Sequence, residues 1–409
     1  MNGAWQPMVV FVVVALAISL RFIPKLRGYQ FTAWIIAAVT VAMIFPQAFK
    51  SWGGVNLREK WLILLVVQTV MFGMGTQMSL KDFAGVAKSP RGVLVGIVCH
   101  FSVMPLVGLA LTKLFHFEPE IAAGIILIGS CSSGLASNVM AYIAKSNLAL
   151  SVTVTAITTL VAPVMTPFLM TQLAGTLVEV KFFNMMMEII KMVIVPIGAA
   201  LLHDYLKHAS VQNRRIVLGV AAVSAAWLAG LGFGGWNYFA ARLGVEAMAV
   251  LDGLRFFAGA VVVGVAYHWL TRQLPKLDAW MPVASMAGIV YFTTVTTAAG
   301  RDNLLQVGGL LFFASALHNA AGYFFGYWLS RASGLDKNSA RSVAFEVGLQ
   351  NGGMASGLAG AMGKLGTVGL AAAIFSPWMN VSGSILANYW RKRPVETQQS
   401  SVNPFESTE

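Results

Sequence analysis

Long runs of apolar residues dominate this sequence and constrain its fold more than any other feature. The runs recur from about residue 8 to residue 390, separated by short polar connections. About 20 apolar residues in a helix cross the hydrocarbon core of a bilayer, because a helix rises about 1.5 Å per residue. The runs are too long and too uniform for the strands of a membrane barrel. We therefore predict an all-α integral membrane protein.

The low content of charged residues supports this class. Only 11% of the 409 residues are charged, whereas soluble domains carry about 25%. The net charge of +12 is a feature shared with proteins that bind nucleic acid. Here, however, Lys and Arg are scattered one to three per connection, as in the short cytoplasmic loops of membrane proteins. We therefore expect the partner to be the lipid bilayer and not nucleic acid.

The positions of the runs predict thirteen spans. They cover residues 8–23, 31–47, 61–80, 93–114, 120–145, 148–172, 185–202, 216–233, 254–271, 280–299, 308–329, 338–362 and 366–390. With the N-terminus outside and the C-terminus cytoplasmic, the inner connections hold 18 of the 28 Lys and Arg residues. This orientation satisfies the positive-inside rule. We expect a multi-pass protein of a bacterial inner membrane with a disordered tail at 394–409.

Two of these spans are interrupted at their centres by small and polar residues. The span 120–145 contains Gly-Ser-Cys-Ser-Ser-Gly at 129–134, and the span 338–362 contains Glu-Val-Gly-Leu-Gln-Asn-Gly-Gly at 346–353. Such interruptions at matching places in two halves are typical of inverted-repeat transporters. The halves would be residues 31–172 and 185–390, and the second would hold an insertion at about 208–278 with two extra spans.

The interruptions predict binding sites for ions. Backbone groups must be hydrogen-bonded in hydrocarbon, so a broken helix is tolerated only where it is buried in protein or lines a cavity. The amides at a helix N-terminus suit an anion, and freed carbonyl groups suit a hard cation such as sodium. Side-chain oxygens flank both breaks, in Ser137, Asn138, Glu346, Gln350 and Asn351. These ligands favour sodium over zinc or copper.

Several of these residues have a second interpretation. Glu346 is an acid within a predicted span, which is costly if unpaired, but with Arg341 nearby it could instead lie close to the membrane surface. Ser151 and Thr155 share one helix face, where they either ligate an ion or bond their own backbone. His100 is either a hydrogen-bonded structural residue or a proton or ligand site, and His318 and Asn319 are expected to join helices.

The chain resembles the bile acid:sodium symporter family from about residue 31 to 390, outside the insertion. The resemblance rests on the order and spacing of five motifs: Phe72-Gly73-Met74-Gly75, Ala136-Ser137-Asn138-Val139-Met140, Ala149-Leu150-Ser151-Val152, Glu346-Val347-Gly348-Leu349-Gln350-Asn351 and Asn380-Val381-Ser382-Gly383-Ser384. It implies two inverted five-helix repeats with crossed discontinuous helices. The implied core is 93–172 and 308–390, and the implied panel is 31–80, 185–202 and 280–299. Residues 1–30 and 208–278 would add about three further membrane helices.

The resemblance also implies which residues bind. One sodium ion would be held by the side chains of Ser137, Asn138, Ser151, Thr155 and Glu346. A second would be held by the side chains of Glu346 and Gln350 and by the backbone carbonyls of Val347 and Leu349, with His100 beside them. The organic anion would lie near the amides of Leu135 and Ala136, within reach of Asn351 and Asn380. No organic cofactor is implied.

Three positions depart from the family pattern. His100 stands where the family commonly has a glutamine that contributes to the second sodium site. Ser132-Ser133-Gly134-Leu135 replaces a Pro-Gly-Gly-Thr-like stretch, and Met379 replaces a histidine that often precedes Asn380. The first sodium site is therefore expected to be intact, whereas the second site and the contact with the substrate differ.

The predicted function is sodium-coupled symport of a small organic anion by alternating access. The anion would be a carboxylate such as a bile acid, a pantoate-like acid or a 2-oxo acid. The alternative is a proton-coupled or sodium-independent carrier, which His100 motivates. An intramembrane enzyme is less favoured, because the sequence has neither paired acids nor a His-Glu-x-x-His metal motif. A receptor gains support only from the extra spans.

Overall fold

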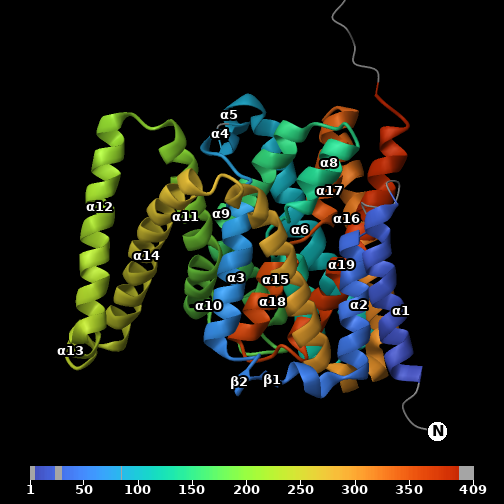
Figure 1. Cartoon of the computed structure of the whole chain (residues 1–409). Helices are drawn as coiled ribbons and strands as arrows, with labels where there is room; N and C mark the ends of the chain where they lie inside the picture. Colours follow the sequence, from blue (N-terminus) through green and yellow to red (C-terminus); the bar gives the residue numbers. More distant parts are fainter. Residues whose placement is uncertain (1–4, 24–29, 84, 396–409) are drawn as a thin grey trace, which may run out of the picture.

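The computed structural model describes residues 5–23, 30–83 and 85–395, and almost all of them lie in helices (Figure 1). In chain order the elements are α1 (Trp5–Ser19), the 3-10 helix η1 (Leu20–Phe22), α2 (Gln30–Ile44), the 3-10 helix η3 (Pro46–Phe49), the strands β1 (Ser51–Trp52) and β2 (Val55–Asn56), α3 (Lys60–Gly75), α4 (Leu80–Phe83), α5 (Gly85–Lys88), α6 (Pro90–Phe115), α7 (Pro119–Ser130), α8 (Ala136–Ile143), α9 (Leu148–Ala174), α10 (Phe182–Ile189), the π-helix η4 (Ile190–Ile194), α11 (Val195–His208), α12 (Val211–Gly230), the π-helix η5 (Leu231–Gly235), α13 (Trp236–Ala240), α14 (Val245–Gln273), α15 (Leu277–Ala299), α16 (Arg301–Ala332), α17 (Lys337–Gly348), α18 (Gly352–Ala361) and α19 (Val368–Arg391).

The described helices confirm the all-α membrane fold. Eight of them are long and apolar enough to cross a bilayer, or nine if α3 and the bent α4–α5 segment form one span. Each of the thirteen predicted spans overlaps one continuous helix or one interrupted helix. Nine of these thirteen spans are the long helices just described. Of the other four spans, two are α1 and α2, which are apolar but have only 15 residues each. The last two are the predicted broken helices, α7–α8 and α17–α18. The predicted tail from 396 onward lies outside the described residues.

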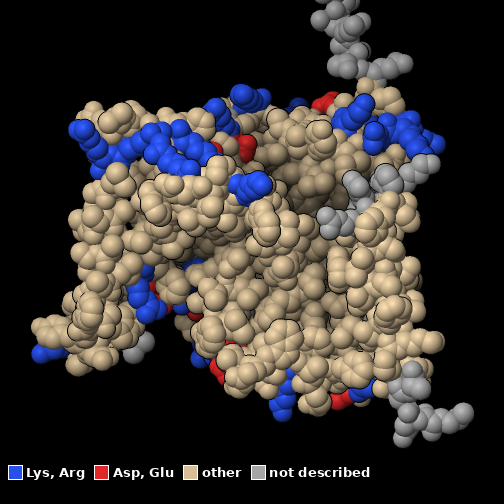
Figure 2. Space-filling view, viewed as in Figure 1, with Lys and Arg blue, Asp and Glu red and all other residues tan. Residues whose placement is uncertain are grey.

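The connections that were predicted to face the cytoplasm gather at one end of the molecule. Figure 1 shows α4, α5, the start of α12 and the C-terminal end of α19 at this end, and β1, β2 and α13 at the opposite end. Figure 2 shows many of the Lys and Arg side chains along the first end. This segregation of basic side chains is what a membrane orientation set by the positive-inside rule requires.

The two broken helices lie in a bundle with α6, α9, α16 and α19. Helix α17 contacts α16, α6, α8 and α9, and α7 contacts α6, α9 and α19. A second set of helices packs beside this bundle, in which α3 contacts α11 and α15, and α2 contacts α15. Helix α18 contacts α3 of this second set, so one half of a broken helix lies where the two sets meet.

The inserted segment forms a helical hairpin at one edge of the molecule, with α14 on α11 and α12 on α14 (Figure 1). Its outer face is apolar and open, with Val223 72% and Phe233 94% exposed, as expected for helices that face lipid. Two polar clusters join α14 to the neighbouring helices. Near one end Lys191 bonds to Asp252 at 3.3 Å.

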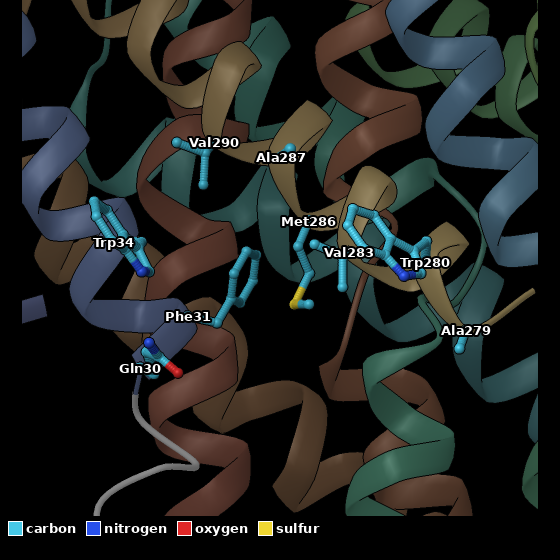
Figure 3. A pocket seen from close by; sticks show the side chains of 9 residues that line it. All are labelled: Gln30, Phe31, Trp34, Ala279, Trp280, Val283, Met286, Ala287 and Val290. Carbon is cyan, nitrogen blue, oxygen red and sulfur yellow. The ribbon is translucent and has the colours of Figure 1, made fainter. Parts of the chain in front are cut away.

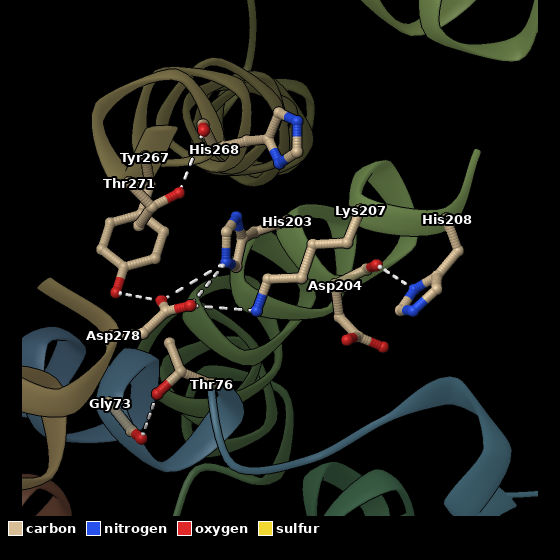
Figure 4. A network of polar contacts seen from close by, with 10 residues as sticks. All are labelled: Gly73, Thr76, His203, Asp204, Lys207, His208, Tyr267, His268, Thr271 and Asp278. Atoms are coloured by element: carbon tan, nitrogen blue, oxygen red, sulfur yellow. Dashed lines mark hydrogen bonds and ion pairs between the residues drawn. The ribbon is translucent and has the colours of Figure 1, made fainter. Parts of the chain in front are cut away.

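The second cluster lies near the other end and centres on Asp278 of α15 (Figure 4). The Asp278 carboxylate accepts a hydrogen bond from Tyr267 of α14 at 2.8 Å and pairs with Lys207 of α11 at 3.0 Å. His203 of α11 lies 3.4 Å from the same carboxylate. One acid thus joins three helices.

Candidate functional site

The two helix interruptions meet at the centre of the bundle and pair with each other. Ser133 and Gln350 form an antiparallel bridge. The amide of Gly134 donates to the carbonyl of Leu349 at 3.0 Å, and the amide of Asn351 donates to the carbonyl of Ser132 at 2.9 Å. The predicted breaks are therefore confirmed, and the two broken helices cross where they unwind.

The crossing requires a glycine on one side. A Cβ atom at position 134 would lie 2.6 Å from the carbonyl oxygen of Gln350, which is far inside van der Waals contact. Because this neighbour is backbone, it cannot rotate away. Gly134 is therefore what lets the two chains approach closely enough to pair.

Caps fix where the adjoining helices begin. The side chain of Asp336 accepts from the amides of Asn338 and Ser339 at the start of α17, and Asn147 and Asn351 cap α9 and α18 in the same way. Burial alone would raise the pKa of Asp336, but the hydrogen bonds from Ser339 and Asn338 bring this pKa below its usual value. These caps satisfy amides that a helix start leaves without partners.

All five residues predicted for the first sodium ion lie together. Ser151 Oγ is 2.5 Å from Glu346 Oε1, and Thr155 Oγ1 is 2.8 Å from Glu346 Oε2. The same two hydroxyls lie 2.9 Å and 3.2 Å from Asn138 Oδ1. Ser137 Oγ completes the group at 3.2 Å from Thr155 Oγ1. Glu346 is fully buried, so its carboxylate lies inside the helix bundle.

The Glu346 carboxylate is buried among neutral side chains that carry oxygen atoms. Ser151 and Thr155 each carry one hydroxyl hydrogen, yet each faces both Asn138 Oδ1 and one carboxylate oxygen of Glu346. Each hydroxyl can donate to only one of these two neighbours at a time. No Lys or Arg side chain pairs with Glu346 in the described part of the chain. A buried carboxylate in these surroundings calls for a cation.

The residues predicted for the second sodium ion are also close together, but protein donors already contact their carbonyl groups. Gln350 Nε2 donates to the carbonyl of Val347 at 2.7 Å, and Gly134 donates to that of Leu349. His100 is fully buried, with Nδ1 2.9 Å from the carbonyl oxygen of Glu346 and Nε2 2.8 Å from that of Cys131. The ring of His100 thus joins α17 to the end of α7.

The residues predicted for the anion lie around the crossing but do not all meet. Leu135 and Ala136 are partly exposed at the start of α8, and Asn351 is buried on the other break. Asn351 Nδ2 is 3.4 Å from Ser132 Oγ. Asn380 bonds to its own helix, donating to the carbonyl of Ser376 at 2.7 Å.

Other polar residues support the breaks and were not predicted as site residues. Asn319 of α16 donates to the carbonyl of Gly348 at 2.8 Å and accepts from Ser382 at 2.5 Å. Thr166 of α9 donates to the carbonyl of Ser130 at 2.7 Å. The expectation that Asn319 and His318 join helices is confirmed, since His318 Nε2 lies 2.7 Å from the carbonyl of Met104. For Asn319 and Thr166, the available signal in the sequence was a polar residue inside an apolar span.

A pocket of about 840 Å³ lies between α2 and α15 (Figure 3). Its walls are mainly apolar, with Phe31, Trp34 and Trp280 among the lining side chains. None of the predicted sodium or anion residues lines it. The candidate site is thus the crossing itself, where Asn138 is the one member of the first sodium set that is partly exposed.

Comparison with known proteins identifies the family. The profile of the sodium bile acid symporter family matches residues 63–233. An uncharacterised sodium-dependent transporter of Bacillus subtilis, YocS, is 31% identical over 386 residues, covering 93% of this chain and 97% of YocS. The chain belongs to the sodium bile acid symporter family. The resemblance seen in the motifs is confirmed.

More distant members of the sodium bile acid symporter family extend the comparison. A probable sodium/metabolite cotransporter of Arabidopsis thaliana chloroplasts, BASS1, is 28% identical over 91% of this chain and 76% of its own length. The human ileal sodium/bile acid cotransporter is 27% identical over 71% of this chain and 66% of its own length. These names all describe transporters.

A solved structure with the same architecture supports the fold. The sodium proton antiporter MjNhaP1 of Methanocaldococcus jannaschii superposes with a TM-score of 0.55 at 11% identity, covering 95% of this chain and 98% of the antiporter. At this identity the likeness concerns the fold alone. It supports the assignment of this symporter-family chain to the crossed-helix transporter folds.

Proposed function

We propose that this protein is a sodium-coupled secondary active symporter of a small organic anion. The observation that carries the proposal is the buried Glu346 carboxylate, which lies among side-chain oxygens and has no Lys or Arg partner among the described residues. A sodium ion bound by Ser137, Asn138, Ser151, Thr155 and Glu346 would neutralise the carboxylate and take the side-chain oxygens of these residues as ligands. The names of the relatives, which include sodium-dependent and sodium/bile acid transporters, support the choice of sodium.

The anion would bind beside this cation at the start of α8. Helix N-termini carry partial positive charge, and the amides of Leu135 and Ala136 lie at such an end. Asn351 and Asn380 would add polar contacts. A carboxylate such as a bile acid, a pantoate-like acid or a 2-oxo acid satisfies this chemistry, and no organic cofactor is needed.

Transport would occur by alternating access. The core, residues 93–172 and 308–390, would move against the panel, residues 31–80, 185–202 and 280–299. The additions 1–30 and 208–278 would stay with the panel, since α14 packs on α11 and α1 packs on α2. The protein would lie in a bacterial inner membrane with its C-terminus in the cytoplasm, because the end rich in Lys and Arg faces inward under the positive-inside rule.

Uptake into proteoliposomes tests this function. A panel of labelled carboxylates is offered with and without an inward sodium gradient, and at least one is expected to accumulate only with sodium. Glu346→Ala is expected to abolish the sodium-driven component. Accumulation by this variant at the wild-type level would refute the assignment.

His100 motivates a second candidate, a proton-coupled or sodium-independent carrier. It is fully buried at the crossing, where a titratable ring could serve a proton-coupled cycle. This candidate predicts uptake that survives the removal of sodium and follows a pH gradient. The same proteoliposomes decide between the two candidates when sodium is replaced by choline.

A further inference from the structure

We infer that His100 takes the place of a second sodium ion, so that the chain binds a single sodium ion, at the Glu346 cluster. This inference rests on the proposed sodium coupling and specifies its stoichiometry. The ring of His100 lies between the carbonyl oxygens of Glu346 and Cys131, at 2.9 Å and 2.8 Å. The ring therefore fills the space from which a cation could reach the ends of both broken helices.

The His100 ring occupies the space between the two carbonyl oxygens in every protonation state. A histidine ring carries an N–H on at least one nitrogen, and here each nitrogen faces a carbonyl oxygen. In either tautomer the ring bonds to one of the two helix ends and excludes an ion from the space between them. The residue is fully buried, so it has no open direction in which to swing aside.

The neighbouring carbonyl groups of α17 have protein donors as well. Val347 accepts from Gln350 Nε2 at 2.7 Å, Gly348 from Asn319 Nδ2 at 2.8 Å and Leu349 from the amide of Gly134 at 3.0 Å. A carbonyl oxygen has two lone pairs, so these bonds give the unwound end of α17 protein partners and leave His100 as the group that excludes an ion. Among the side chains of the described residues, Gln350 Oε1 is a buried acceptor without a partner here, and this neutral oxygen does not by itself make a site for a hard cation.

The two candidate cation positions thus differ in kind. At the Glu346 cluster a buried carboxylate lies among side-chain oxygens with no Lys or Arg partner in the described part of the chain, whereas around His100 protein donors already reach the carbonyls. The equivalent contact in the second repeat is made by Asn319, which reaches the end of α17 from α16 as His100 reaches the end of α7 from α6. Each broken helix is therefore held by a polar side chain of the preceding helix.

Binding of radioactive sodium to the purified full chain in detergent tests the inference. The wild type is expected to bind one ion per chain at saturation, with a Hill coefficient of one. His100→Gln, which replaces the ring with a smaller side chain that has an oxygen ligand, is expected to bind two. His318 is a buried histidine outside both predicted sets of sodium ligands, and the control variant His318→Gln is expected to bind one sodium ion.

The outcomes separate the inference from the proposed function. No bound sodium in the wild type would overturn the sodium coupling itself. Two ions in the wild type, or one ion in a folded His100→Gln variant, would overturn the role given to His100. Size-exclusion chromatography and thermal unfolding show whether His100→Gln is folded. If it is not, His100→Asn supplies the same comparison. The number of sodium ions bound by the wild type is measured without any variant.

Discussion

Ser151 Oγ lies 2.5 Å from Glu346 Oε1, although 195 residues separate the two in the chain. Helix α9 of the first repeat thus brings its hydroxyl groups onto the only acid of the second break. This contact makes Glu346 part of both halves of the protein. A cation bound here would be held by both repeats at once.

Removing the charge of Glu346 is the most direct test of this arrangement. Glu346→Gln keeps the size of the side chain but removes the charge that balances the cation. Losing the partner of a buried charge costs about 3–5 kcal/mol, so we expect sodium binding to weaken by at least about 100-fold. The measurement is the concentration of sodium that half-saturates the rise in Tm. Glu188→Gln, another acid in a membrane helix, should retain the wild-type value.

Thr155 and Thr153 on α9 allow a matched comparison. Thr155 faces Glu346, whereas the Thr153 hydroxyl bonds to the carbonyls of Ala149 and Asp82. A hydrogen bond to a charged group contributes about 1.5–3 kcal/mol. We therefore expect Thr155→Val to weaken sodium binding by about 10- to 150-fold. Thr153→Val should change it by less than about 3-fold, and equal effects of the two variants would contradict the proposed cluster.

Gly134 tests whether the crossing itself is needed. In Gly134→Ala the added methyl group would lie 2.6 Å from the carbonyl oxygen of Gln350, so the two breaks must separate. We expect a lower Tm and no stabilisation by sodium. Gly198→Ala is the control, because nothing lies within 4 Å of the added atom and Ala favours a helix by about 1 kcal/mol. A Gly134→Ala variant with normal sodium binding would show that the close approach is dispensable.

Asp278 tests the attachment of the hairpin. Asp278→Asn loses the charge pair with Lys207 and weakens the contact with His203 (Figure 4). Loss of a partly buried polar contact costs about 1–3 kcal/mol, and we expect Tm to fall by about 1–4 °C. Sodium binding should not change, because the cluster lies outside the crossing. Asp302→Asn removes an exposed ion pair and should leave Tm within about 1 °C, since exposed pairs contribute little.

The sequence by itself determined the membrane class, the helical spans and the position of both breaks. These depend on local composition: apolar runs long enough to cross a bilayer, and a cluster of glycine, serine, asparagine and glutamine within two of them. Glu346 stood out for the same reason, since an acid in an apolar span is costly unless a partner compensates it. The motifs around Ser137 and Ser151 then indicated the family.

The tertiary structure decided which of these groups touch. His100 and Glu346 are 246 residues apart, and only the packing of α6 against α17 places the ring at the Glu346 carbonyl. The partners of Val347 and Leu349, and the support from Asn319, depend likewise on how the helices pair. The contact that His100 makes with the end of α7 is matched at the end of α17 by Asn319. Local composition specifies where a helix breaks, but the partners of its freed carbonyl groups come from distant helices.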